Sequence, residues 1–212
     1  MEPDFCSHVP AGWTVHAARM YMEDTTVEGE NRMLDEFVFP AARDLATARP
    51  HVIVFGCTSA GALRGNEYEA WLTQEISTRT GIPTVSVIRS VRDALGDLSA
   101  SQLVVITPYV DSLNDRIKAS LEEDGSTVLR ICGLGIRENF MIARVSGGTI
   151  LDLARQAVAD LKPDALFVSC TNFPAFSTLA ELRRAFSFPV LTSNQAVLDV
   201  ALAVARGQRS TS

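Results

Sequence analysis

Residues 51–63, HVIVFGCTSAGAL, and residues 164–176, DALFVSCTNFPAF, share one pattern. Each stretch is a short apolar run followed by a small residue, a Cys-Thr pair and a small or polar residue. Cys57 and Cys170 hold the same place in the two stretches. Apolar runs of this length are typical of strands buried in parallel sheets, so each cysteine is expected directly after a strand.

Strand-like runs and helix-like patterns alternate along the whole chain. The apolar runs predict strands over 14–18, 52–55, 84–88, 103–107, 127–132, 165–169 and 190–192. Apolar residues at helical spacing predict helices over 31–48, 67–80, 91–98, 113–124, 149–161, 176–185 and 194–207. This alternation indicates an α/β fold with parallel sheets.

The repeat extends beyond the Cys-Thr pairs. GIPTVSVIRSVRDAL follows the first pair and SFPVLTSNQAVLDVAL follows the second, while WTVHAARMYMED and STVLRICGLGIREN precede them. The chain therefore reads as two tandem α/β units, residues 1–98 and 99–212, related by a pseudo-twofold axis. The C-terminal helix predicted over 194–207 is a candidate to pack on the first unit.

The two copies differ at their beginning. The second copy opens with a strand and turn, QLVVITPYVDSLNDR, and the first copy has no counterpart of it. We therefore expect either that the true start of the chain lies upstream or that the first unit lacks its first strand. A missing strand would leave an apolar sheet edge without a hydrogen-bonding partner.

Composition excludes several classes of partner. The net charge of −6 disfavours a nucleic acid or an anionic membrane, although backbone N–H groups at a helix start can still bind a small anion. No apolar run reaches the ~20 residues that span a bilayer. The N-terminus, MEPDFCSHVPAGW, lacks the parts of a signal peptide, so a cytoplasmic protein is expected. Four cysteines are too few for a disulfide framework, and we expect free thiols.

Cys57 and Cys170 are the candidate catalytic residues. Each is expected where a strand ends and a helix begins, and the positive end of a helix dipole is expected to lower a thiol pKa. Short donors stand beside each sulfur and could bind a carboxylate, namely Thr58, Ser59, Thr171 and Asn172. A single buried cysteine after a strand is usually a small core residue, but two in matched contexts favour a functional pair.

A pseudo-twofold axis would place one sulfur on each side of a shared cleft. Such a pair could remove a proton on one face of a substrate and deliver one on the other. It could equally add one thiolate to an activated double bond while the second thiol handles a proton. The residues alone leave these two chemistries open.

GCTSAG and SCTNFP, with TPYVDSLN between them, resemble the aspartate/glutamate racemase superfamily, and within it the maleate cis–trans isomerase and arylmalonate decarboxylase branch. The resemblance covers nearly the whole chain. It implies that Cys57 is a nucleophile, that Cys170 assists proton movement, and that Tyr109 and Asn139 hold substrate carboxylates. Decarboxylases of this branch keep only the second cysteine, so the presence of both implies an isomerase or a racemase.

The resemblance implies a small dicarboxylate substrate of the maleate type and a reaction without metal or organic cofactor; a homodimer stays open. The family usually opens with a strand and turn similar to VPSSNTTME, whereas this chain starts at MEPD. The alternatives are an amino-acid racemase, a binding-only member of the family, and a redox protein with a disulfide between Cys57 and Cys170. The last is disfavoured because the chain has no C-x-x-C motif.

Other polar residues favour structural roles. Asn114 is expected in the first turn of a helix and Cys132 in the core. Cys6, His16 and His51 show no metal-ligand spacing. Residues 23–30, EDTTVEGE, are expected to form a mobile acidic loop and are a candidate lid over the cleft.

Overall fold

Two parallel sheets form the framework of the protein. The computed structural model describes residues 1–209. One sheet has the order β1-β2 and the other β4-β3-β5-β6, with every pairing parallel. The strands are β1 (Ile53–Phe55), β2 (Thr84–Ser86), β3 (Gln102–Thr107), β4 (Thr127–Gly133), β5 (Ala165–Val168) and β6 (Val190–Thr192). The predicted α/β fold with parallel sheets is confirmed.

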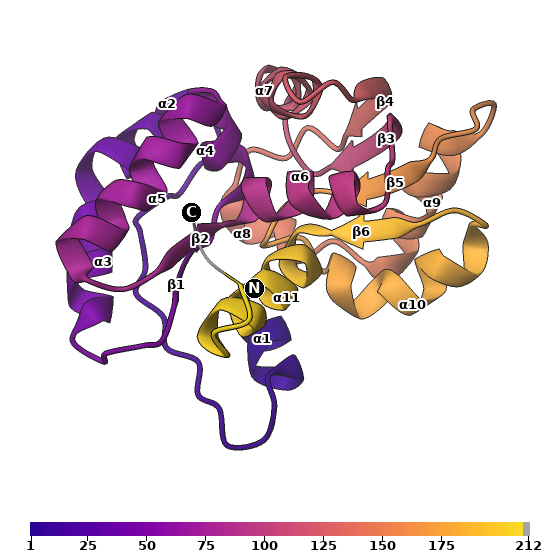
Figure 1. Cartoon of the computed structure of the whole chain (residues 1–212). Helices are drawn as coiled ribbons and strands as arrows, with labels where there is room; N and C mark the ends of the chain where they lie inside the picture. The colour runs from indigo at the N-terminus through magenta and orange to yellow at the C-terminus, as the bar shows by residue number, and fades with distance from the viewer. Residues whose placement is uncertain (210–212) are drawn as a thin grey trace.

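Helices separate the strands and surround both sheets (Figure 1). The helices are α1 (Glu2–His8), α2 (Val27–Arg32), the π-helix η1 (Met33–Phe37), α3 (Val38–Ala46), α4 (Thr58–Leu63), α5 (Asn66–Thr80), α6 (Val87–Asp97), α7 (Asp111–Glu122), α8 (Asn139–Ile142), α9 (Gly147–Val158), α10 (Ala175–Ala185) and α11 (Ser193–Ala205). Within residues 1–209, none of them has both the length and the apolar character to cross a membrane.

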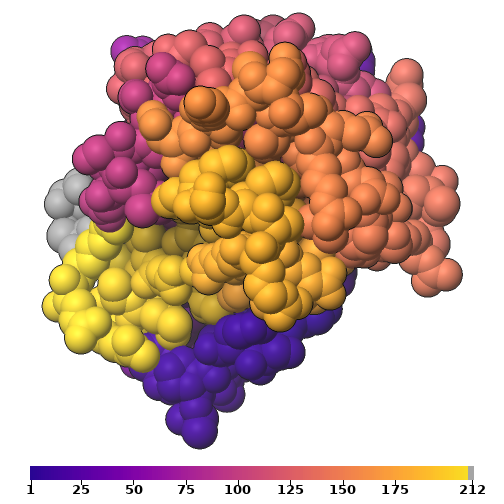
Figure 2. Space-filling view, turned by 90° about the vertical axis from the view of Figure 1, so that its right-hand side faces the viewer, coloured from indigo at the N-terminus to yellow at the C-terminus, as the bar shows by residue number. Residues whose placement is uncertain are grey.

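Helices α6 and α11 join the two sheets. They pack against each other in the middle of the molecule, and α11 also contacts β1 and β2 (Figure 1). Figure 2 shows the N-terminal residues, in indigo, lying against the C-terminal helix, in yellow, and α1 contacts α11. The division of the chain at residue 98 stays a prediction.

The core of the larger sheet follows from its continuous apolar strands. Strand β3 lies between β4 and β5, and all four residues of β5 are fully buried. A strand covered on both faces needs apolar side chains at successive positions, as ALFV and LVVI provide. Strand β5 therefore places Cys170 at a well-packed point of the fold.

The short strands β2 and β6 end at hydroxyl caps. Ser86 accepts a hydrogen bond from the backbone N–H of Arg89, and Thr192 accepts one from Gln195. Helix α6 consequently begins at Val87, so the strand predicted over 84–88 is confirmed only for Thr84–Ser86, and the helix predicted over 91–98 is present but starts earlier. The run Val-Ser-Val-Ile has strand-like side chains, but the cap turns it into a helix start.

Strand β1 has one unpaired edge. Among residues 1–209 it pairs only with β2, whereas its counterpart β5 pairs with both β3 and β6. The strand predicted over 14–18 is wrong, because these residues form an irregular segment. Their counterpart β4 is a strand because β3 supplies a ladder, and the first sheet offers no such ladder to 14–18.

The acidic loop predicted over 23–30 is wrong in its second half. Thr26 caps α2 by accepting the backbone N–H of Gly29, and Glu30 is completely buried. The helix predicted over 31–48 is confirmed in position, but it starts at Val27 and passes through the π-helical turn η1. The remaining predicted helices are present with shifted ends, and the short helices α1, α4 and α8 were missed.

Phe167 in β5 supports the larger sheet, so Phe167→Ala should destabilise the fold. We expect the free energy of unfolding to fall by about 3–5 kcal/mol, because the side chain is fully buried and would leave a cavity. Urea denaturation measures the change. The same truncation at Phe140, which is 64% exposed, should change stability by less than about 0.5 kcal/mol. Equal losses in both variants would contradict this account of the core.

Candidate active site

Cys57 lies between the end of β1 and the first turn of α4. Its backbone is extended, with φ of −137°, and it forms the N-cap of the helix. The Ala60 backbone N–H acts to lower the pKa of the thiol. Serine at position 59 brings a hydroxyl oxygen to 3.8 Å from Cys57 Sγ. The sequence prediction for this turn is confirmed in position.

Cys170 lies at the corresponding point after β5, in a different backbone conformation. Its φ of +104° is in a region that residues with a side chain rarely adopt, at a cost on the order of 1–3 kcal/mol. Its sulfur accepts a hydrogen bond from the backbone N–H of Asn172 at 3.4 Å. Strain of this kind persists where the surroundings hold a side chain in one direction, which is a property of functional sites.

Hydrogen bonds tie the two cysteine turns to each other. Ser193, the first residue of α11, accepts the Thr58 hydroxyl at 2.9 Å and the Cys170 backbone N–H at 3.0 Å. The Thr171 hydroxyl donates to the backbone carbonyl of Gly56 at 3.0 Å. The turns of the two units thus form one rigid group, although Ser193 carried no signal in the sequence.

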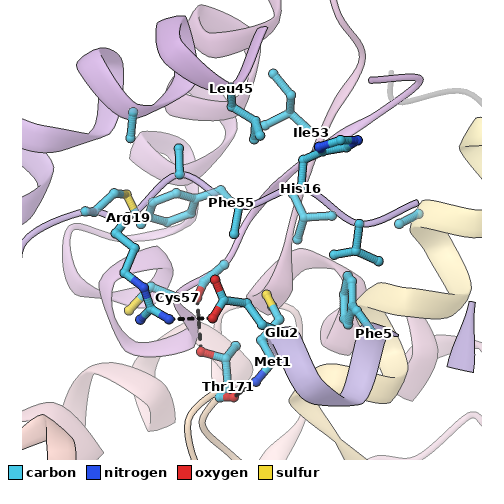
Figure 3. A pocket seen from close by; sticks show the side chains of 18 of the residues that line it. Met1, Glu2, Phe5, His16, Arg19, Leu45, Ile53, Phe55, Cys57 and Thr171 are labelled. Carbon is cyan, nitrogen blue, oxygen red and sulfur yellow. Dashed lines mark hydrogen bonds and ion pairs between the residues drawn. The ribbon is translucent and has the colours of Figure 1, made fainter. Parts of the chain in front are cut away.

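Both thiols border one cavity of about 530 Å³. Figure 3 shows its two ends: Cys57, Glu2 and Thr171 lie at the polar end, while Leu45 and Ile53 lie at the apolar end beside β1. Of the predicted site residues, the structure brings together on this cavity Cys57, Ser59, Tyr109, Asn139, Cys170, Thr171 and Asn172. Thr58 does not line it, because its hydroxyl is turned toward Ser193.

Tyr109 and two asparagines close the polar end. The Tyr109 side chain is 1% exposed, and burial together with the nearby thiols raises its pKa well above the ordinary value. The Asn172 side-chain amide donates to the backbone carbonyl and to Oδ1 of Asn139, at 2.8 and 3.0 Å. Asn139 is in turn held by its backbone N–H, which donates to the Glu23 carbonyl at 2.9 Å. The three side chains are therefore prepositioned.

The expectation that a helix start lowers the thiol pKa values is wrong for this structure. Burial raises the pKa of Cys57 strongly and raises that of Cys170 as well. The backbone N–H groups and the Ser59 hydroxyl act in the opposite direction but are outweighed. Moving a thiolate out of water raises its free energy by more than the dipole of a six-residue helix lowers it. Both cysteines are neutral thiols at neutral pH, so Cys57 needs a proton acceptor to become a nucleophile.

The other polar candidates are distributed as follows. Asn114 lies in the first turn of α7 and accepts the Thr107 hydroxyl at 2.6 Å, as its predicted structural role requires. Cys132 is half-buried in β4 and Cys6 is exposed, and all four cysteines are free. His16 lines the apolar part of the cavity, whereas His51 does not. In residues 1–209 no group of three His, Cys, Asp or Glu side chains could hold a metal ion.

Sequence reasoning missed three polar residues at the site. Arg19 forms an ion pair with Glu2, and both residues line the cavity (Figure 3). Glu30 lies behind Ser59 and accepts its hydroxyl. Ser193 joins the two turns. None of them belongs to a local motif, and each reaches the site from an element distant in sequence.

Similar proteins include enzymes of two kinds. Arylmalonate decarboxylase of Bordetella bronchiseptica is 28% identical over 192 residues, which is 90% of this chain and 80% of that protein. Maleate isomerase of Nocardia farcinica is 27% identical over 199 residues, which is 88% of this chain and 76% of that protein. Maleate isomerase of Alcaligenes faecalis is 23% identical over 186 residues.

Solved structures have the same fold. A crystal structure of arylmalonate decarboxylase matches with a TM-score of 0.76 at 27% identity, over 84% of this chain and 79% of that chain. Nocardia farcinica maleate cis–trans isomerase matches with a TM-score of 0.86 at 24% identity, over 96% and 85% of the two chains. The model of the arylmalonate decarboxylase family, Amdase, matches residues 3–211. The chain therefore belongs to the Amdase family, in the branch that its Cys-Thr motifs predicted.

Proposed function

We propose that this protein is a cofactor-independent cis–trans isomerase of a small dicarboxylate of the maleate type. The observation that carries the proposal is the pair of free thiols, Cys57 and Cys170, on one cavity, each supplied by a different α/β unit. Relatives that cover most of the chain include maleate isomerases. The family resemblance implies that decarboxylases keep only the second cysteine, so the first thiol favours isomerisation.

The reaction begins at Cys57. Its thiolate adds to one alkene carbon of maleate, forming a C–S bond while the π electrons move onto the carboxylate of the other alkene carbon. The former double bond is then single and can rotate. Return of the electrons reforms the double bond, breaks the C–S bond and gives fumarate. Cys170, across the cavity, supplies and recovers a proton at the second carbon when the intermediate is protonated.

Donors at the polar end stabilise the charge that develops on the carboxylates. The Tyr109 hydroxyl and the Asn139 side-chain amide lie there as donors, and Asn172 holds Asn139 in place before substrate enters. Preorganised donors in a dry site stabilise an enediolate-like charge more than water does, because they need no reorientation during reaction. Thr58 and Thr171 contribute by holding the two turns together, and Ser59 lies against Cys57.

A racemase is the second candidate, favoured by the same placement of one thiol from each unit. Two acid–base groups on opposite faces of an α-carbon can exchange its proton and invert the centre. A member of the family that only binds its ligand would lack both activities.

Cys57→Ser and Cys170→Ser should each lower kcat/KM for maleate by about 10³-fold or more, because a hydroxyl is a far weaker acid and nucleophile than a thiol. Fumarate formation followed by proton NMR measures the loss. Cys6→Ser is the matched control, because Cys6 is exposed and does not line the cavity. In Cys170→Ser, peptide mass mapping should find maleate added to Cys57. Full activity in both active-site variants would refute the two-thiol chemistry.

A panel of substrates separates the activities. We expect fumarate from maleate, no CO₂ from phenylmalonate and no D/L exchange of aspartate or glutamate in deuterated water. CO₂ release without fumarate would instead show a decarboxylase, and α-deuteration would show a racemase. Saturable binding of maleate with no product of any kind would show a binding protein.

A further inference from the structure

Glu30 is a buried carboxyl group directly behind the Cys57 turn. It belongs to α2, which packs on α4, and its side chain is 0% exposed. The Ser59 hydroxyl donates a hydrogen bond to Glu30 Oε1. Glu30 Oε2 has no hydrogen-bond partner within residues 1–209. A buried carboxyl with only one oxygen satisfied is costly to maintain, so the group calls for an explanation.

Ser59 connects this carboxyl to the thiol. Its oxygen lies 3.8 Å from Cys57 Sγ, and its single hydroxyl proton is donated to Glu30. With that proton engaged, the Ser59 oxygen can accept but not donate on its other side, where the Cys57 thiol and the Tyr109 hydroxyl both lie beside it. The hydrogen bonds among the three groups therefore point the same way: the Cys57 S–H donates to the Ser59 oxygen, and the Ser59 O–H donates to the Glu30 carboxyl.

The backbone holds Glu30 toward α4. Thr26 caps the helix at the backbone N–H of Gly29, with the hydroxyl oxygen 3.1 Å from the nitrogen. A Cβ atom on Gly29 would come to 2.3 Å from the Asp24 carbonyl oxygen, which is too close for any other residue. The backbone at the residue before Glu30 thus lies very close to Asp24. This close approach limits the directions in which the Glu30 side chain can point.

The groups that face Glu30 are titratable but not cationic. Cys57 and Cys170 are close enough for its charge to raise their pKa values, and Tyr109 borders the same thiols. The charged side chains on α2, η1 and the end of α4 are exposed or pair with one another: Glu28, Arg32 with Glu36, and Asp35 with Arg64. No cation within the described chain neutralises the Glu30 carboxylate.

We propose that Glu30 accepts the Cys57 proton through Ser59, which makes it a positioning residue for the nucleophile rather than a group that touches substrate. This inference rests on the proposed isomerase function. The Cys57 S–H bond breaks and its proton passes to the Ser59 oxygen, while the Ser59 proton passes to Glu30 Oε1. The products are a thiolate, an unchanged serine hydroxyl and a neutral glutamic acid, with the total charge conserved. Elimination of fumarate returns the proton by the reverse path.

The transfer is uphill, because burial keeps the pKa of Cys57 above that of Glu30, and the raised pKa of Glu30 narrows the difference. Burial raises the pKa of Glu30 to about 8, nearer to that of a thiol than an ordinary carboxyl would be. A raised pKa means that the acceptor form, the carboxylate, accumulates only as the pH rises toward this value. Cys57 reactivity and kcat/KM should therefore increase with pH up to about 8 in the unmodified protein.

Alkylation of Cys57 by iodoacetamide tests the relay without any substrate. Peptide mass mapping gives the rate at Cys57 alone from pH 6 to 10. Glu30→Gln should slow the reaction at pH 8 by about 10- to 100-fold and remove the rise near pH 8, because an amide cannot accept the proton. A carboxylate that acted only through its charge would raise the Cys57 pKa, and Glu30→Gln would then speed alkylation. An unchanged or faster rate overturns the proposal.

Four further variants sharpen the result. Glu69→Gln alters another buried carboxyl whose pKa is also raised by burial, on α5 and outside the cavity, and should leave the Cys57 profile unchanged. Ser59→Ala keeps Glu30 but removes the hydroxyl through which the proton passes, and it should slow alkylation as much as Glu30→Gln does. The double variant should be no slower than either single one, because both remove the same path. Glu30→Asp, which keeps an acceptor, should recover part of the rate. Additive losses in the double variant would overturn the relay.

Turnover measurements separate this inference from the proposed function. With maleate, Glu30→Gln should lower kcat about 10²-fold and leave KM within about twofold. It should also abolish the rise in kcat/KM as the pH approaches 8. Turnover with the unmodified pH profile would refute the relay while leaving the isomerase intact. If maleate is not converted by the unmodified protein but alkylation changes as expected, the relay stands and the substrate proposal falls.

Discussion

Hydrogen bonds between the two cysteine turns and the start of α11 hold the candidate site together. Ser193 accepts from the Thr58 hydroxyl and from the Cys170 backbone N–H, and Thr171 donates to Gly56. These groups are buried or half-buried, so breaking one bond would leave an unpaired polar group in a poorly solvated place. The approach of the two thiols to one cavity therefore depends on how α11 packs on α6 and the first sheet.

The same burial sets the chemistry of the thiols. Burial of Cys57 and Cys170 raises the pKa of both thiols and keeps them protonated at neutral pH. A helix start of six residues does not compensate for that loss of solvation. Glu30, a buried carboxyl group, is connected to Cys57 through the Ser59 hydroxyl. Reactivity at such a site depends on where a proton can go rather than on the thiol alone.

Much of the framework could be predicted because it follows from local patterns. Continuous apolar runs identified the strands that precede Cys57 and Cys170, and the internal repeat identified their equivalence. The errors have physical causes. Residues 14–18 have strand-like side chains but no ladder beside them, and Ser86 begins a helix inside an apolar run. Glu30, in an acidic stretch that reads as solvent-exposed, is buried by the packing of α2 on α4.

The sequence by itself determined the α/β class, the duplicated Cys-Thr turns and the polar residues that accompany them, because strand length, helix spacing and turn composition are properties of neighbouring residues. Only the tertiary structure decided that Ser193 joins the two turns, that Thr58 is turned away from the cavity and that Glu30 stands behind Ser59. These relations connect elements far apart in the chain. They arise from helix packing and from the cost of burying polar groups, which no local pattern of residues records.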